Sequence, residues 1–221
     1  MPFLGEAGPA YHGRMLAALI SFTLASLVIV ILPGPDTLVV VRSLVRGGRR
    51  AGIRTAAGVL CGLAVWVVAA VVGLSALLRA SEVGYEALKI VGACYLVWMG
   101  VQSLRALRRP VGVASDTSSV APLDRAGNFG AGLLTDILNP KVGVLFVSFL
   151  PGFVPDGYSP TWTTLAFGAV YIALTALYCL ALVVASGSIS TWMRTDRIRR
   201  RIDAMTGLVL VGFGVRLATE S

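Results

Sequence analysis

The chain has 221 residues, of which 56% are hydrophobic and only 14% are charged, and its mean hydropathy is +0.81. Soluble domains average about 45–50% apolar and about 25% charged residues, so the composition argues against a soluble globular enzyme and a disordered chain. A helix needs about 20 apolar residues to cross a bilayer, and six such helices would use most of this chain. The composition therefore predicts an all-α, polytopic membrane protein without a second, soluble domain.

Six apolar runs are separated by polar or charged stretches. They cover residues 15–32, 51–78, 90–104, 127–154, 161–185 and 204–218. The first run could be a signal peptide, but it is longer than a usual apolar core, lacks a small-residue cleavage site and follows only Arg14, so we interpret it as a membrane span. The run at residues 51–78 contains Gly58 and Gly62, four positions apart, which would let this span approach a neighbouring helix closely.

The basic residues alternate between the two sides of these runs. Five arginines lie between runs one and two, four between runs three and four, and five between runs five and six, whereas the opposite loops and ends hold four Lys and Arg. Cytoplasmic loops carry an excess of Lys and Arg, so the pattern predicts six spans, three cytoplasmic arginine loops and both termini outside. The same placement argues against nucleic-acid binding, although the net charge is +8.

Cysteines and known motifs point to no cofactor and no metal. Cys61, Cys94 and Cys179 lie singly within apolar runs, and their spacing suits neither a metal site nor a disulfide framework. We interpret them as small buried helix residues. No phosphate-binding loop occurs, which argues against ATP-driven transport by this chain alone.

A polar loop at residues 110–126 divides the chain into two halves of three spans, residues 15–109 and 127–218. Each half opens on an apolar run that proline interrupts. Because three is an odd number, the two halves must insert with opposite orientations. Inverted repeats with broken helices in matching places are typical of secondary transporters, which bind substrate at the breaks. The alternative is two chance kinks, since membrane helices tolerate proline.

Proline chemistry predicts the shape of the first break. Pro33 and Pro35 should end the first helix near Leu32, because proline removes a backbone donor and clashes with the preceding turn. Pro35 suits the first position of a new helix, and Gly34 gives the turn its freedom. Asp36 follows at once and places a charge in the break.

The second break is predicted to restart a helix in the same way. Asn139 is a candidate N-cap, with Pro140 at the first helical position. Two helix N-termini that face each other would suit a carboxylate, and unwound carbonyls there could accept from an ammonium group. A zwitterionic amino acid carries both groups.

Asp36, Asp136 and Lys141 are the ionisable residues well inside the predicted spans. Such a charge costs about 2.5–3.5 kcal/mol on insertion scales, so it usually pairs or faces a cavity. We expect Asp36 to pair with Lys141, with Asp136 and Lys141 as the local alternative. Either aspartate is a candidate carrier of a coupling proton, and a purely structural ion pair is the simpler interpretation.

Two stretches resemble the LysE/RhtB family of amino-acid exporters. The first is Leu-Pro-Gly-Pro-Asp at residues 32–36, followed by Arg-Gly-Gly-Arg-Arg-Ala-Gly at residues 46–52. The second is Gly-Leu-Leu-Thr-Asp-Ile-Leu-Asn-Pro-Lys at residues 132–141, followed by Phe-Leu-Pro-Gly-Phe at residues 149–153. The resemblance covers about residues 15–218, and the two proline motifs are specific as a pair.

The resemblance implies a transporter and not an enzyme. It implies one transmembrane domain over residues 1–221, with six helices in two inverted halves, of which helices one and four are broken. It also implies export of amino acids or close derivatives across the plasma membrane by the proton motive force. The matching transport positions are Pro33, Gly34, Pro35, Asp36, Asn139, Pro140 and Lys141. Asp136 is a further candidate, although the family often has a less acidic residue there.

Other functions remain alternatives at this point. The wider superfamily includes ion carriers, so an ion channel or ion carrier is the second hypothesis. A membrane scaffold or an intramembrane enzyme is a third, and no nucleophile–base pair supports the enzyme. The sequence leaves the exported amino acid open, as it does the coupling ion and whether the chain forms a homo-oligomer.

Overall fold

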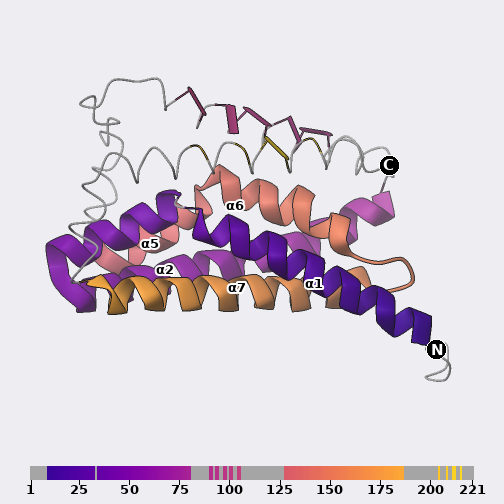
Figure 1. The fold of residues 1–221 in the computed structure, drawn as a ribbon, viewed down its shortest axis with the longest axis horizontal. Coiled ribbons are helices and arrows are strands. Elements are labelled where there is room, and N and C mark those ends of the chain that lie inside the picture. The colour runs from indigo at the N-terminus through magenta and orange to yellow at the C-terminus, as the bar shows by residue number, and fades with distance from the viewer. Residues whose placement is uncertain are drawn as a thin grey trace.

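The computed structural model describes residues 9–32, 34–80 and 127–186, with isolated helical positions between residues 90 and 105 and between 204 and 215. The described elements are all helical, as the composition predicts. Figure 1 shows the long helices lying side by side with their axes roughly aligned.

The first break lies where the prolines predict it. Helix α1 (Pro9–Ile31) ends one residue before the predicted Leu32, and α2 (Pro35–Ala80) begins at the predicted proline. Helix α1 starts earlier than the apolar run that predicted it. Pro33 itself lies outside the described residues.

Helix α2 turns back on itself at Gly48. This glycine has φ 69° and ψ −168°, a left-handed conformation that side chains other than glycine rarely adopt. The ribbon reverses there, so residues 35–47 and 49–80 form two antiparallel arms (Figure 1). The hydroxyl of Thr55 on the second arm donates to the Ser43 hydroxyl on the first, at 2.8 Å. The arginine-rich stretch therefore forms the turn between two spans, as the charge pattern predicts.

The second half opens on the predicted broken helix. Its elements are α5 (Gly127–Ile137), α6 (Pro140–Val144), the π-helical turn η2 (Leu145–Phe149), the 3-10 turn η3 (Leu150–Phe153) and α7 (Pro160–Val184). The stretch from Gly127 to Ile137 meets the stretch from Lys141 to Phe153 at 51°. Helix α7 matches the fifth predicted run.

Within the described residues, three helical stretches are long and apolar enough to cross a membrane. They are Gly13–Ile31, Pro35–Gly73 and Pro160–Val184, and the bent pair in the second half makes a fourth if it is one span. The predicted spans at residues 90–104 and 204–218 lie mostly outside the described residues. A multi-pass membrane protein is thus supported, whereas six spans in a full inverted repeat stay a prediction.

The two broken stretches run in opposite directions. Helix α5 runs parallel to the second arm of α2, and therefore antiparallel to α1 and the first arm (Figure 1). The turn of α2 and the last residues of α7 lie at the same end of the bundle, where Arg49 Nη2 donates to the Val184 carbonyl at 3.4 Å. These ends lead into arginine-rich stretches, so the arrangement is consistent with the predicted alternation of loops.

Helices α2 and α5 approach each other closely because of glycine. A Cβ atom at Gly58 would lie 2.0 Å from the Phe129 carbonyl oxygen, and one at Gly132 would lie 2.0 Å from the Thr55 carbonyl oxygen. Neither distance allows a side chain. The close approach predicted from Gly58 and Gly62 is therefore confirmed, with α5 as the neighbour.

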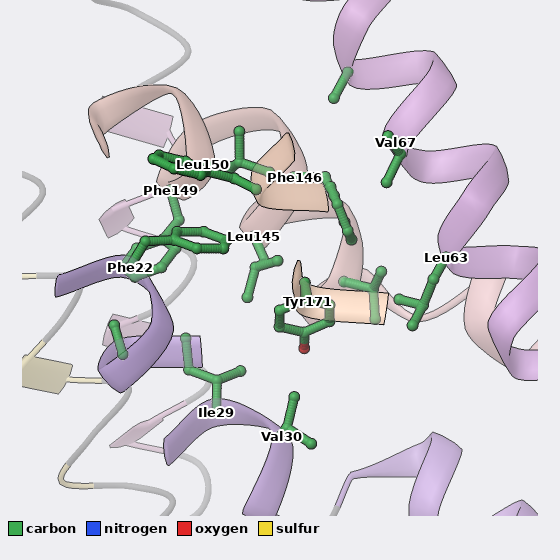
Figure 2. Close-up of a cluster of buried hydrophobic side chains, with 14 residues drawn as sticks. Phe22, Ile29, Val30, Leu63, Val67, Leu145, Phe146, Phe149, Leu150 and Tyr171 are labelled. Atoms are coloured by element: carbon green, nitrogen blue, oxygen red, sulfur yellow. The ribbon is translucent and has the colours of Figure 1, made fainter. Parts of the chain in front are cut away.

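Aromatic rings hold α1 against the second half of the chain. Phe22 stacks on Phe167 of α7 with ring centroids 4.7 Å apart and meets Phe153 of η3 edge-on at 5.4 Å. Phe146 contacts Tyr171 edge-on at 5.5 Å. Figure 2 shows this cluster between α1, α2, the turns η2 and η3, and α7. Contacts of this kind stabilise helices in lipid, where apolar burial alone provides little drive for association.

The cysteines are less buried than their apolar neighbours suggest. All three are free thiols, but only Cys179 is buried, whereas Cys61 and Cys94 are exposed on the helices. The expectation of three buried cysteines is wrong for these two, because an apolar run in a membrane helix includes its outer face as well as its packed face.

Candidate functional site

A hydrogen bond joins the two helix breaks. Asn139 Nδ2, at the start of α6, donates to Asp36 Oδ2, in the first turn of α2, at 2.7 Å. The two residues are 103 positions apart in the chain. The prediction that the breaks of the two halves face each other is therefore confirmed for this contact.

Asn139 also caps its own helix. Its Oδ1 accepts from the backbone N–H of Lys141 at 3.1 Å, and Pro140 opens α6. Both features were predicted from the sequence. The side-chain amide of Asn139 thus bonds the second break through its oxygen and the first break through its nitrogen. These two hydrogen bonds fix the distance between the two breaks.

Lys141 binds the end of α1. Its buried Nζ donates to the carbonyl oxygens of Ile29 at 3.0 Å and Leu32 at 3.2 Å. The last carbonyls of a helix have no partner within the helix and carry a partial negative charge, which attracts an ammonium group. Gly34 lies beside this side chain, and a Cβ placed there would be 3.8 Å from Nζ, an ordinary van der Waals distance.

Asp36 and Lys141 interact electrostatically, as expected, but within the described residues neither Asp36 nor Asp136 makes a hydrogen bond or a direct ion pair with Lys141. Lys141 donates to α1 carbonyls, and Asp36 accepts from the Asn139 amide. The sequence pattern shows which residues are charged, but it does not show that the end of α1 offers acceptors to the same ammonium group.

A cavity of about 30 Å³ lies between α1, both arms of α2, α6 and α7. Typical ligand pockets measure about 300–1,000 Å³, so this conformation has room for water rather than for an amino acid. Its polar lining consists of Asp36, Thr37, Lys141, Tyr171, Thr175 and Tyr178. Figure 2 shows the Tyr171 hydroxyl turned away from the aromatic rings and toward Ile29 and Val30, which also line the cavity.

Asp36 presents an unused acceptor in this place. Its Oδ2 accepts from Asn139, whereas its Oδ1 is buried and makes no hydrogen bond to any described residue. Since Asp36 lines the cavity, this oxygen can accept from a ligand group without breaking the contact between the two breaks.

The hydroxyl residues of α7 were not predicted as site residues. Tyr171, Thr175 and Tyr178 lie at positions i, i+4 and i+7, which places them on one face of the helix. This spacing within an otherwise apolar run is the signal that could have found them. Thr37, in the first arm of α2, has no comparable signal.

Asp136 lies apart from the other predicted site residues. It is 0% exposed, and among the described residues neither of its carboxyl oxygens has a hydrogen-bond partner. It does not line the cavity, and it packs against Gly62 of α2 instead. Asp36, Asn139 and Lys141 thus lie in one site together with Gly34. Pro35 opens α2 and Pro140 opens α6 at this site.

Comparison with known proteins places the chain in a family. The family model of the LysE type translocator matches residues 27–221. The chain is 33% identical to the uncharacterized membrane protein PA4757 of Pseudomonas aeruginosa, over 91% of this chain and 94% of that protein.

Two further relatives have named activities. The chain is 29% identical to the threonine efflux protein of Escherichia coli K12, over 92% of this chain and 98% of that protein. It is 28% identical to the leucine efflux protein of Salmonella choleraesuis, over 90% of this chain and 93% of that protein. No solved structure matches the chain significantly. Because the family model covers almost the whole chain, this protein belongs to the LysE type translocator family.

Proposed function

We propose that this chain exports an amino acid, or a close derivative, across the plasma membrane by alternating access. The observation that carries the proposal is the pair of joined helix breaks, with Asp36 and Lys141 both lining one cavity. Relatives that are threonine and leucine efflux proteins support an amino acid as the substrate.

The two charged groups match the two ends of an amino acid. Asp36 Oδ1 is a free acceptor for a substrate ammonium group, and Lys141 is a donor for a substrate carboxylate. To reach the carboxylate, the Lys141 ammonium group has to leave the α1 carbonyls, which then become acceptors for the substrate as well. The small size of the cavity agrees with this movement, because in this proposal the space for the substrate forms when the Lys141 side chain moves away.

The energy source in this proposal is the proton motive force. One charge that moves through 100 mV releases about 2.3 kcal/mol, which corresponds to a concentration ratio of roughly fifty. The predicted orientation places the arginine loops in the cytoplasm and both termini outside. In this proposal, protons enter the cell as the amino acid leaves it. No enzymatic step and no cofactor are needed.

The test is efflux from cells that express the protein and are loaded with dipeptides containing threonine, leucine or other amino acids. Asp36→Asn is expected to lower efflux at least about tenfold, because a hydrogen bond to a charged group contributes about 1.5–3 kcal/mol. Asp156→Asn is the matched control, since Asp156 is an exposed acidic residue between η3 and α7. It should export at the wild-type rate.

Two results would contradict the proposal. Equal efflux by wild type and Asp36→Asn for each amino acid that wild type exports would remove Asp36 from the transport site. Ionic current across a bilayer that contains the purified protein, without any amino-acid flux, would favour an ion channel.

A further inference from the structure

Asp136 is a buried carboxyl group that the proposed substrate site does not use. It lies in the last turn of α5, it is 0% exposed, and neither carboxyl oxygen has a hydrogen-bond partner in the part of the chain that the structure describes. A buried carboxylate without a partner is far costlier than a neutral carboxyl group. A neutral carboxyl group therefore suits this environment better than a carboxylate does.

The surroundings of Asp136 are closely packed on the side of α2. A Cβ atom at Gly62 would lie 2.5 Å from Asp136 Oδ2, so the second arm of α2 packs directly on the carboxyl group. Asp36 on the first arm and Tyr171 on α7 interact with it electrostatically, and neither is a cation. Lys141 on α6 directs its ammonium group to α1.

The backbone of Asp136 is part of the second break. Its carbonyl oxygen accepts from the Asn139 N–H at 3.0 Å and from Trp66 Nε1 at 3.3 Å. The side chain of Asn139 in turn holds Asp36. A continuous series of contacts thus leads from the buried carboxyl group to the cavity.

From this geometry we propose that Asp136 carries the coupling proton of the transport cycle, at a place separate from the substrate site. The inference rests on the proposed export function. The carboxyl group takes up a proton from the outer side and stays neutral while α2 and α5 are packed together. When these helices part at Gly62, water reaches the carboxyl group and the proton leaves to the cytoplasm. The resulting shift of α5 displaces Asn139, and the cavity changes with it.

The test separates exchange from uphill transport in proteoliposomes. Exchange of labelled amino acid for unlabelled amino acid needs substrate binding but no net proton movement. Accumulation driven by a gradient of one pH unit needs the proton, and one proton per substrate sustains about a tenfold concentration ratio, equivalent to about 1.4 kcal/mol. The variants are Asp136→Asn and, as a matched control, Ser26→Ala, which removes another buried side-chain oxygen without a hydrogen-bond partner.

Asp136→Asn is expected to keep exchange and to lose the tenfold accumulation, whereas Ser26→Ala keeps both. Accumulation at the wild-type level by Asp136→Asn would overturn the inference, and so would equal loss of exchange and accumulation in a folded variant. Failure of the export proposal looks different, because the wild-type protein would then show no amino-acid exchange.

Infrared spectroscopy tests the proton without relying on transport or on the folding of Asp136→Asn. The wild-type protein should show the carbonyl band of a protonated carboxyl group, and Asp36→Asn should retain this band. Its loss in Asp36→Asn would assign the proton to Asp36 and overturn the inference.

Discussion

Replacing Lys141 with methionine is expected to abolish amino-acid efflux. Methionine has a similar length but no charge, so the carbonyls of Ile29 and Leu32 lose their donor and the site loses its partner for a substrate carboxylate. Hydrogen bonds to charged groups contribute about 1.5–3 kcal/mol each, which predicts a loss of at least about tenfold per bond. The measurement is efflux from dipeptide-loaded cells, corrected for the amount of protein in the membrane.

The other lysine of the chain provides the matched control. Lys89 is predicted to lie in an outer loop, so Lys89→Met removes the same charge away from the site and should export normally. Lys141→Arg keeps the charge but needs more space beside Gly34, so we expect an intermediate rate. Wild-type efflux by Lys141→Met would show that the ammonium group only stabilises the end of α1.

The second large effect is expected from Gly132→Ala in α5. The added Cβ atom would lie 2.0 Å from the Thr55 carbonyl oxygen, which belongs to the backbone of α2 and cannot turn away. The two helices must therefore separate, and such overpacking costs about 1–3 kcal/mol. Thermal unfolding of the detergent-solubilised protein, followed by the amount that elutes as a single species, measures the loss.

Gly73→Ala in α2 is the control for this substitution. Among the described residues, no atom lies within 4 Å of a Cβ placed at Gly73, so the alanine makes no close contact with them. Alanine favours a helix over glycine by up to about 1 kcal/mol, and the control should unfold at the same or a slightly higher temperature. A Gly132→Ala protein that is as stable as this control would contradict the close contact of α2 with α5.

The structure also relates stability and transport at one contact. Gly58 and Gly62 lie one helical turn apart on the face of α2 that meets α5, and Gly62 packs against the Asp136 carboxyl group. A contact without side chains can separate and close again without moving side chains out of the way. The same small residues that pack the helices would thus allow the movement that the proposed proton transfer needs.

Much of the site was predictable from local chemistry. Proline at positions 35 and 140 starts a helix because its missing N–H needs no partner there, and Asn139 caps one because its side chain bonds an unpaired N–H. These effects act over a few residues, so the sequence alone shows them. The alternation of arginines is equally readable, because each loop meets one side of the membrane independently.

The partners of the charged groups were not predictable in this way. The choice of Lys141 between Asp36 and the carbonyls of α1 depends on where α1 ends in space relative to α6. The separation of Asp136 from the cavity depends on the side of α5 that the second arm of α2 covers. Both are properties of packed helices, and no local sequence signal encodes them.

By itself, the sequence determined the class of protein, the two helix breaks and their caps, and the short set of charges inside the spans, because composition and local backbone chemistry suffice for each. Only the tertiary structure decided that Asn139 joins the two breaks, that Lys141 binds the end of α1, and that the Asp136 carboxyl group packs against Gly62 outside the cavity. The physical reason is that a buried polar group takes the partner that packing brings within reach, and packing depends on the whole chain.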